Sequence, residues 1–128
     1  MGLHIIAEFL GVKEEKIART KQVKQIVEEA IKKSGLNVVR SAYHQFEPYG
    51  VTCFYLLKES HLAIHTWPEV NYAAIDIFTC DRGGKAKETL RLLKKGFSPS
   101  EVKIRVVEKL QYEELLRRAK NNKRARQA

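Results

Sequence analysis

The chain has 128 residues, of which 44% are hydrophobic and 30% charged, with a formal net charge of +9. This length suits one domain that buries a core without disulfides or metals, and the apolar content excludes a disordered chain. No run of about 18 apolar residues is present, and the N-terminus lacks the basic segment and cleavage site of a signal peptide. We therefore expect a cytoplasmic protein without a membrane span, in which Cys53 and Cys80 are thiols.

Part of the positive charge belongs to the C-terminal end. Six of the 24 basic residues lie in the last twelve positions: Arg117, Arg118, Lys120, Lys123, Arg124 and Arg126. Clustered basic residues favour polyanionic partners, but here the excess is partly a property of the tail. We expect a domain over residues 1–110 and a basic tail over 111–128. The tail is compatible with a helix after Gln111, although its last residues are expected to stay loose.

The apolar pattern predicts an alternation of strands and two helices. In chain order these are a strand over 3–9, a helix with apolar positions from Ile17 to Ile31 that ends at Gly35, strands over 38–46 and 51–57 joined by a turn at 47–50, strands over 62–67 and 72–79, a turn at 81–84, a helix over 85–95 and a strand over 103–107.

This order favours an α+β fold, a two-layer α/β sandwich with a largely antiparallel sheet and two helices on one face. The other sheet face then needs cover. A sheet-packed homodimer would supply it, although loops could also fill part of that face.

The densest chemical stretch is KESHLAIHTWPE, residues 58–69, which holds a serine, two histidines and two glutamates. A serine and a histidine can act as nucleophile and base in catalysis. Closeness in sequence does not establish that the two side chains are in contact or that a third group orients the histidine. His61 and His65, four residues apart, would share one face of a helix and could bind metal there. The segment is strand-like and lacks an HExxH arrangement, so we predict no metal site.

With YHQFEPYGVT before it and YAAIDIFTC after it, this stretch resembles the prokaryotic S-adenosylmethionine decarboxylase proenzyme family. In that family the pattern ESHL-x-IHTWPE-x-x-Y-A-x-ID-x-F-x-C surrounds a self-processing serine. The resemblance runs from about His4 to Val107. It implies a pyruvoyl-dependent carboxy-lyase that acts on S-adenosylmethionine and supplies the aminopropyl donor for spermidine, hence polyamine, biosynthesis.

The resemblance also implies autocatalytic cleavage of a zymogen between Glu59 and Ser60. An N-to-O acyl shift and β-elimination would turn Ser60 into a pyruvoyl group, giving a β chain of residues 1–59 and an α chain of residues 60–128. The pyruvoyl ketone would form a Schiff base with the substrate amine and act as the electron sink, so that no pyridoxal phosphate is needed.

Further roles follow from the same resemblance. His65 matches the proton acceptor in processing and Cys80 the proton donor in catalysis. Thr52 stands where the family usually has a serine that binds the processing intermediate, and its extra methyl predicts slower or incomplete cleavage. Phe46 matches an aromatic that stacks on adenine, and Glu69 a carboxylate that binds the ribose hydroxyls.

Some residues of the motif keep a purely structural interpretation. Cys53 has no family counterpart and is expected to be a buried thiol. The roles of Tyr49, His61 and Trp67 stay open, because each could simply shape the turn or pack. Taken alone, Phe46 would more often be a core residue and Glu69 a solvated charge.

Strand geometry raises a difficulty, because Ser60 and His65 are five residues apart and would point to opposite faces of a regular strand. A bulge or turn between them could repair this. The larger eukaryotic relatives resemble two fused copies that share their sites, which suggests another solution: a homodimer of αβ units. Ser60 and Cys80 of one protomer would then meet a set from its neighbour consisting of Thr52, His65, Phe46 and Glu69.

Three other functions are compatible with the sequence. A pyruvoyl-dependent arginine decarboxylase could use the same scaffold, although Phe46 and Glu69 favour a nucleoside-bearing substrate. Thr52 could mark a poorly processed, inactive homologue. A nucleic-acid-binding module would use the basic tail and show a steep salt dependence.

Overall fold

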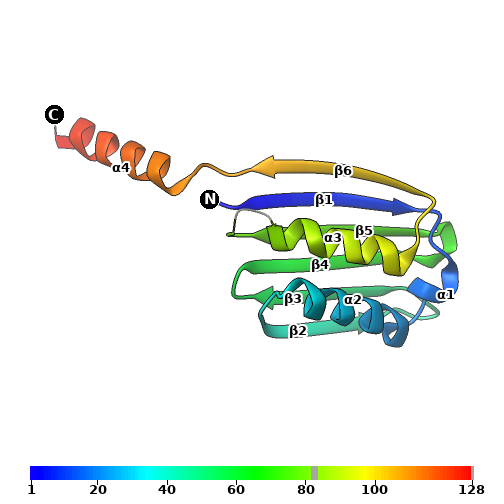
Figure 1. Ribbon diagram of the computed structural model, residues 1–128. Helices are drawn as coiled ribbons and strands as arrows, with labels where there is room; N and C mark the ends of the chain where they lie inside the picture. The colour runs from blue at the N-terminus through cyan, green and yellow to red at the C-terminus, as the bar shows by residue number, and fades with distance from the viewer. Residues whose placement is uncertain (82–83, 128) are drawn as a thin grey trace.

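A computed structural model describes residues 1–81 and 84–127. Its six strands form one antiparallel sheet in the order β2-β3-β4-β5-β1-β6 (Figure 1). The strands are β1 (Leu3–Leu10), β2 (Val38–Gln45), β3 (Val51–Leu57), β4 (Ser60–Trp67), β5 (Tyr72–Thr79) and β6 (Glu101–Glu108). The predicted α+β class with an antiparallel sheet is therefore confirmed.

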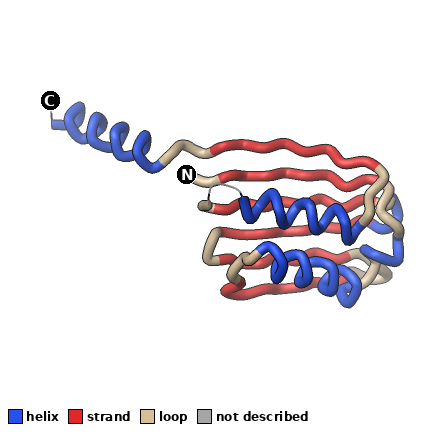
Figure 2. Tube along the Cα trace, in the orientation of Figure 1, coloured by secondary structure: helices blue, strands red, loops and turns tan. Residues whose placement is uncertain are grey.

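The helices are α1 (Glu14–Ile17), α2 (Thr20–Ser34), α3 (Gly84–Phe97) and α4 (Tyr112–Gln127), with a 3-10 turn, η1, at Pro68–Val70. Helices α2 and α3 lie side by side on one face of the sheet, as predicted (Figure 2). The first expected helix is divided into α1 and α2. Gly35 ends α2 with a φ of +77°, a left-handed conformation that suits glycine.

The core lies between the sheet and these two helices. Alternate strand residues such as Ile5, Tyr55 and Ile64 are buried there, together with Val27 of α2 and Leu93 of α3. The opposite face carries the other half of each strand, and we call it the open face. Large apolar side chains are more than a third exposed on it, namely Ile6, Phe54, Leu56, Trp67 and Val107.

Two strands have boundaries that differ from the predicted ones. Strand β4 begins at Ser60 rather than at residue 62, so the candidate cleavage residue is the first residue of a strand. Strand β6 runs over Glu101–Glu108, longer than predicted. Of the predicted turn at 81–84, residues 82 and 83 lie outside the described part of the chain.

The C-terminal tail forms a helix after Gln111, as the sequence allowed, but its last residues up to Gln127 are helical instead of loose. Its first turn pairs Glu114 with Arg117 and Arg118, at the three- and four-residue spacings that stabilise a helix surface. Helix α4 leaves the end of β6 and projects away from the two-layer body (Figure 1). Among the described helices, none is long and apolar enough to cross a membrane.

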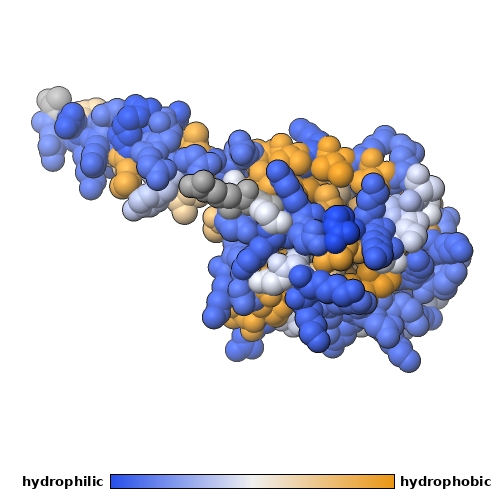
Figure 3. All heavy atoms as spheres, in the orientation of Figure 1, coloured by the Kyte–Doolittle hydropathy of each residue, from blue (hydrophilic) through white to orange (hydrophobic). Residues whose placement is uncertain are grey.

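The helix-bearing face is not fully covered. Figure 3 shows apolar side chains remaining visible along the β6 edge beside α3. Ile104 and Val106 are about half exposed there, and their register partners Ala7 and Ile5 face the core. The two helices are therefore too few to cover all six strands.

Candidate active site

The Glu59–Ser60 bond lies in the tight hairpin that joins β3 to β4. The backbone N–H of Lys58 donates to the carbonyl oxygen of Asn37 at 2.9 Å, and Ser60 pairs with Thr79 of β5. Ser60 has a φ of +152°, a region that residues with a side chain rarely adopt. The backbone is therefore strained at the residue that follows the predicted cleavage point.

Cys80 lies directly beside this bond. Its backbone N–H donates a 2.7 Å hydrogen bond to the carbonyl oxygen of Glu59, the carbonyl of the Glu59–Ser60 peptide. Cys80 is exposed and lines a cavity of about 700 Å³ that reaches Gly2 and Tyr112. Cys53 is buried among the core residues, and burial raises the pKa of its thiol to about 11. The predicted burial of the Cys53 thiol is therefore confirmed.

Thr52 and His65 meet at the other end of the sheet. They are direct partners across β3 and β4, both on the open face. The Thr52 Oγ1 and His65 Nδ1 atoms lie 3.0 Å apart, within hydrogen-bonding distance. A hydroxyl at position 52 is therefore in contact with the imidazole even though the residue is threonine.

A cavity of about 380 Å³ brings four of the predicted residues together. Phe46, Thr52, His65 and Glu69 all line it. Tyr49 and Trp67, whose roles the sequence left open, line it too. Phe46 is 47% exposed, so part of its ring is available to a ligand.

Two side chains that the sequence did not single out hold this cavity in shape. Buried Thr66 accepts from the backbone N–H of Val51 at 2.9 Å and donates to the carbonyl of Ile17 at 2.8 Å. The amide of Gln45 donates to the carbonyl of Gly50 and accepts from the backbone N–H of Thr20. Their partners are distant in sequence, so no local pattern reveals this role.

The structure does not bring Ser60 and His65 together within one protomer. Both lie on β4, whose pairing with β5 is in continuous register from Ser60 to Trp67. A strand rises about 3.3 Å per residue, which separates the two residues by roughly 16 Å along the sheet. The register shows no bulge between the two residues, so a bulge does not bring them together within one protomer.

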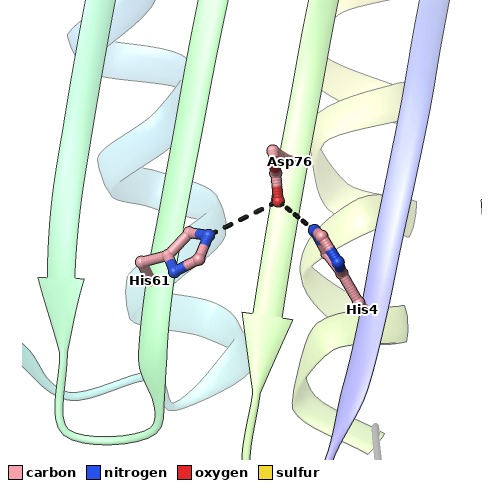
Figure 4. A group of neighbouring side chains, drawn as sticks. All are labelled: His4, His61 and Asp76. Atoms are coloured by element: carbon pink, nitrogen blue, oxygen red, sulfur yellow. Dashed lines mark hydrogen bonds and ion pairs between the residues drawn. The ribbon is translucent and has the colours of Figure 1, made fainter. Parts of the chain in front are cut away.

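A third cluster involves His61, whose role the sequence left open. Asp76 Oδ1 lies 2.6 Å from His4 Nε2 and 3.4 Å from His61 Nε2, all on the open face (Figure 4). Phe54 stacks on His61 with ring centroids 5.7 Å apart. Within the described residues, this is the one group of three metal-ligating side chains that could hold an ion. As arranged, a single carboxylate oxygen already faces both imidazoles.

Known proteins match most of the length of this chain. The family model for S-adenosylmethionine decarboxylase matches residues 3–110. The S-adenosylmethionine decarboxylase proenzyme of Archaeoglobus fulgidus is 45% identical over 109 residues, which cover 85% of this chain and 97% of that protein. The proenzyme of Aquifex aeolicus is 38% identical over 109 residues, which cover 85% and 81%.

A solved structure gives the same result for the fold. The crystal structure of the adenosylmethionine decarboxylase from Aquifex aeolicus superposes with a TM-score of 0.83 at 35% sequence identity, over 88% of this chain and 94% of that one. With the family match over most of its length and these identities, the chain belongs to the S-adenosylmethionine decarboxylase family.

Proposed function

We propose that the chain is a proenzyme that cuts itself between Glu59 and Ser60 and then decarboxylates S-adenosylmethionine through a pyruvoyl group formed at residue 60. The relatives that carry this activity in their names support the substrate and the reaction. The observation that carries the proposal is local: the Glu59 carbonyl is held by the Cys80 N–H at 2.7 Å, next to a serine with a φ of +152°.

The cleavage chemistry uses this geometry. The Ser60 hydroxyl adds to the Glu59 carbonyl carbon, and the Cys80 N–H stabilises the negative charge that develops on the carbonyl oxygen. The C–N bond then breaks, leaving an ester and a free Ser60 amine. A base removes the Ser60 α-proton, the bond between the Ser60 β-carbon and the ester oxygen breaks, and Glu59 leaves as a carboxylate. Addition of water to the remaining dehydroalanine and loss of ammonia leave a ketone at residue 60.

The residues around position 60 fit such a group. Once formed, the pyruvoyl group supplies an electron-accepting carbonyl for decarboxylation. Exposed Cys80 lines the 700 Å³ cavity, where its thiol is proposed to donate a proton to the decarboxylated carbon. The strain at Ser60 would be relieved once the bond to Glu59 is cut, which favours the forward reaction.

His65 is the base in this proposal. Its Nδ1 faces Thr52 Oγ1, and this contact fixes the orientation of the ring. When Nδ1–H donates to Thr52, Nε2 is left to accept the Ser60 α-proton. Thr52 is therefore the hydroxyl that orients the base and binds the processing intermediate.

The 380 Å³ cavity is the proposed site for the nucleoside part of the substrate. Phe46 offers a partly exposed ring to stack on adenine, and Glu69 a carboxylate to accept hydrogen bonds from the ribose hydroxyls. We assign these functions to a catalytic domain over residues 1–110 and treat 111–128 as an appended basic tail. The family match over residues 3–110 supports this division.

A homodimer with shared sites would bring the separated groups together. Ser60 and His65 lie at opposite ends of the sheet, roughly 16 Å apart along β4. A two-fold axis that packs the open faces together would place the Ser60 end of one protomer over the His65 end of the other. Apolar side chains exposed on the open face, including Phe54 and Leu56, support such a contact.

Intact-mass analysis tests the proposed activity. We expect fragments 1–59 and 60–128, the second with a pyruvoyl-blocked N-terminus, and release of carbon dioxide from S-adenosylmethionine but not from arginine. A single-chain mass that persists after prolonged warm incubation would contradict the proposal.

Mixed protomers test the shared site. Differently tagged Ser60→Ala and His65→Ala chains should each stay uncut alone. In mixed dimers the His65→Ala chain should be cut, because its partner supplies His65. No cleavage in mixed dimers that had been isolated through both tags would rule out sharing.

A further inference from the structure

The side chain of Glu59 is held in place beside the bond that is cut. Its Oε1 accepts from the backbone N–H of Asn37 at 3.0 Å, and its Oε2 accepts from the Asn37 side-chain amide at 2.7 Å. The ammonium of Lys85 also donates to Oε2, at 3.0 Å. Only 11% of the Glu59 side chain is exposed. We call these contacts the Glu59 anchor.

The anchor is charged. Burial of Glu59 opposes ionisation, but the hydrogen bonds from Asn37 and Lys85 outweigh it and hold the pKa of the carboxyl at about 2. The carboxylate is therefore ionised at neutral pH. Hydrogen bonds to an ionised acceptor are shorter and stronger than those between neutral groups.

The three residues of the Glu59 anchor come from different parts of the fold. Asn37 lies in the connection between α2 and β2, Lys85 in the first turn of α3, and Glu59 in the β3–β4 hairpin. The anchor therefore fixes the hairpin to the helix layer. Since α2 and α3 pack on the core, the hairpin is held against a rigid support.

The same residue is also held through its main chain. The Glu59 carbonyl oxygen accepts from the Cys80 N–H at 2.7 Å. With both its side chain and its carbonyl bound, Glu59 has little freedom to rotate, so its carbonyl is held in one orientation beside Ser60. Intramolecular attack depends steeply on such alignment, and a misplacement of about 1 Å can cost roughly a hundredfold in rate.

From this geometry we infer that Asn37 and Lys85 are positioning residues for self-cleavage, acting through the Glu59 carboxylate to hold the Glu59 carbonyl for attack by Ser60. This inference rests on the proposed self-cleavage. The anchor contacts neither the substrate cavity nor Thr52 and His65, so its effect falls on the cutting step.

The rate of self-cleavage tests this role. Glu59→Gln, Asn37→Ala and Lys85→Met chains are prepared unfolded, refolded together with the wild type, and followed by intact mass. We expect each to be cut roughly ten to a hundred times more slowly than the wild type. Lys85→Arg keeps a cationic donor and should recover most of the rate. Fragments that do form should decarboxylate S-adenosylmethionine with a wild-type kcat.

A merely structural anchor would give a different pattern. Melting temperatures show whether the variants are as stable as the wild type. Hydroxylamine, which cuts esters, measures how much of the chain has undergone the acyl shift. In the anchor variants the hydroxylamine-cleavable fraction should fall in parallel with the cleavage rate at equal folded fraction. As a matched control, Lys33→Met removes an exposed pair with Glu29 at 2.8 Å on α2 and should leave cleavage unchanged.

The outcomes are distinguishable. A wild-type chain that stays uncut would overturn the proposed function itself. A wild type that is cut while Glu59→Gln and Lys85→Met are cut at the same rate would overturn only the positioning role. Slower cleavage that is fully explained by a lower folded fraction would also overturn it, with Lys85→Arg as the check on folding.

Discussion

The two ends of the sheet are built differently. At the Ser60 end, polar and charged contacts fix the backbone: the Glu59 anchor, the Cys80 hydrogen bond and the strained serine. At the His65 end, buried contacts shape a cavity in which several lining side chains, such as Phe46 and Trp67, stay accessible. One end holds a peptide bond still, whereas the other keeps space for a ligand.

This difference explains why neither end is a complete site. An immobilised bond without a base cannot complete the cut, and a cavity without an electrophile cannot decarboxylate its ligand. The roughly 16 Å between them along β4 lies within one protomer. In our proposal the dimer joins them, so a substitution at one end should leave the other end intact.

The largest effect is expected for Ser60→Ala, which removes the nucleophile at the first end. Cleavage should stop altogether, because no other hydroxyl is bonded to that backbone position. The cavity at the second end should still bind S-adenosylmethionine, as measured by calorimetry. Ser41→Ala, on exposed β2, is the matched control and should be cut at the wild-type rate. Any cleavage at 59/60 in the Ser60→Ala chain would contradict the assignment.

Cys80→Ala should separate the two reactions at the first end. The backbone N–H of Cys80 remains, so cleavage should continue, whereas loss of the thiol should lower kcat for decarboxylation by about 10² to 10⁴. Cys53→Ala is the control. Its thiol is buried, so it should lower Tm without changing kcat. Equal kcat in Cys80→Ala and the wild type would exclude Cys80 as the proton donor.

The sequence predicted the fold well because the period-two pattern of each strand matches its register in the sheet. The family resemblance grouped Phe46, Thr52, His65 and Glu69, and all four line the same cavity. The comparisons confirm the family. The catalytic roles of these residues stay predictions.

Contacts between distant segments could not be predicted. Asn37 and Lys85 lie 22 and 26 residues from Glu59, on either side of it, and nothing local distinguishes them from other polar residues. Gln45 and Thr66 are similar cases. The helix after Gln111 was compatible with the sequence, but its extension to Gln127 was not expected, because the charge of the last residues argued against order. Pairs such as Glu114 with Arg118 form only once the helix exists.

The charge of the Glu59 anchor should appear as a pH dependence of stability, best measured in a Ser60→Ala background that keeps one chain. The pKa of Glu59 falls from an ordinary 4.5 to about 2 in the folded protein. Its contribution is therefore fully present above about pH 4.5 and is lost as the pH falls towards 2. Adding Glu59→Gln should lower Tm by about 5 °C at neutral pH and by almost nothing at pH 2. Parallel Tm curves for the two chains would contradict an ionised anchor.

The smallest effect is expected at the second end, where Thr52 replaces the serine usual in the family. The threonine predicted slow or incomplete cleavage, because its methyl restricts the side-chain rotamers. In the structure, however, Thr52 Oγ1 already lies 3.0 Å from His65 Nδ1, so the hydroxyl reaches its partner despite the methyl. Thr52→Ser should therefore change the cleavage rate by no more than about threefold. The greater rotational freedom of the serine side chain offsets the advantage of its smaller size.

Thr52→Val keeps the shape but removes the hydroxyl, and it should slow cleavage by about tenfold, as expected for one lost hydrogen bond. The rate constants of the three chains, measured by intact mass at equal folded fraction, separate the effect of the methyl from that of the hydroxyl. A large acceleration in Thr52→Ser would mean that the methyl, and not the joining of the two ends, limits the reaction.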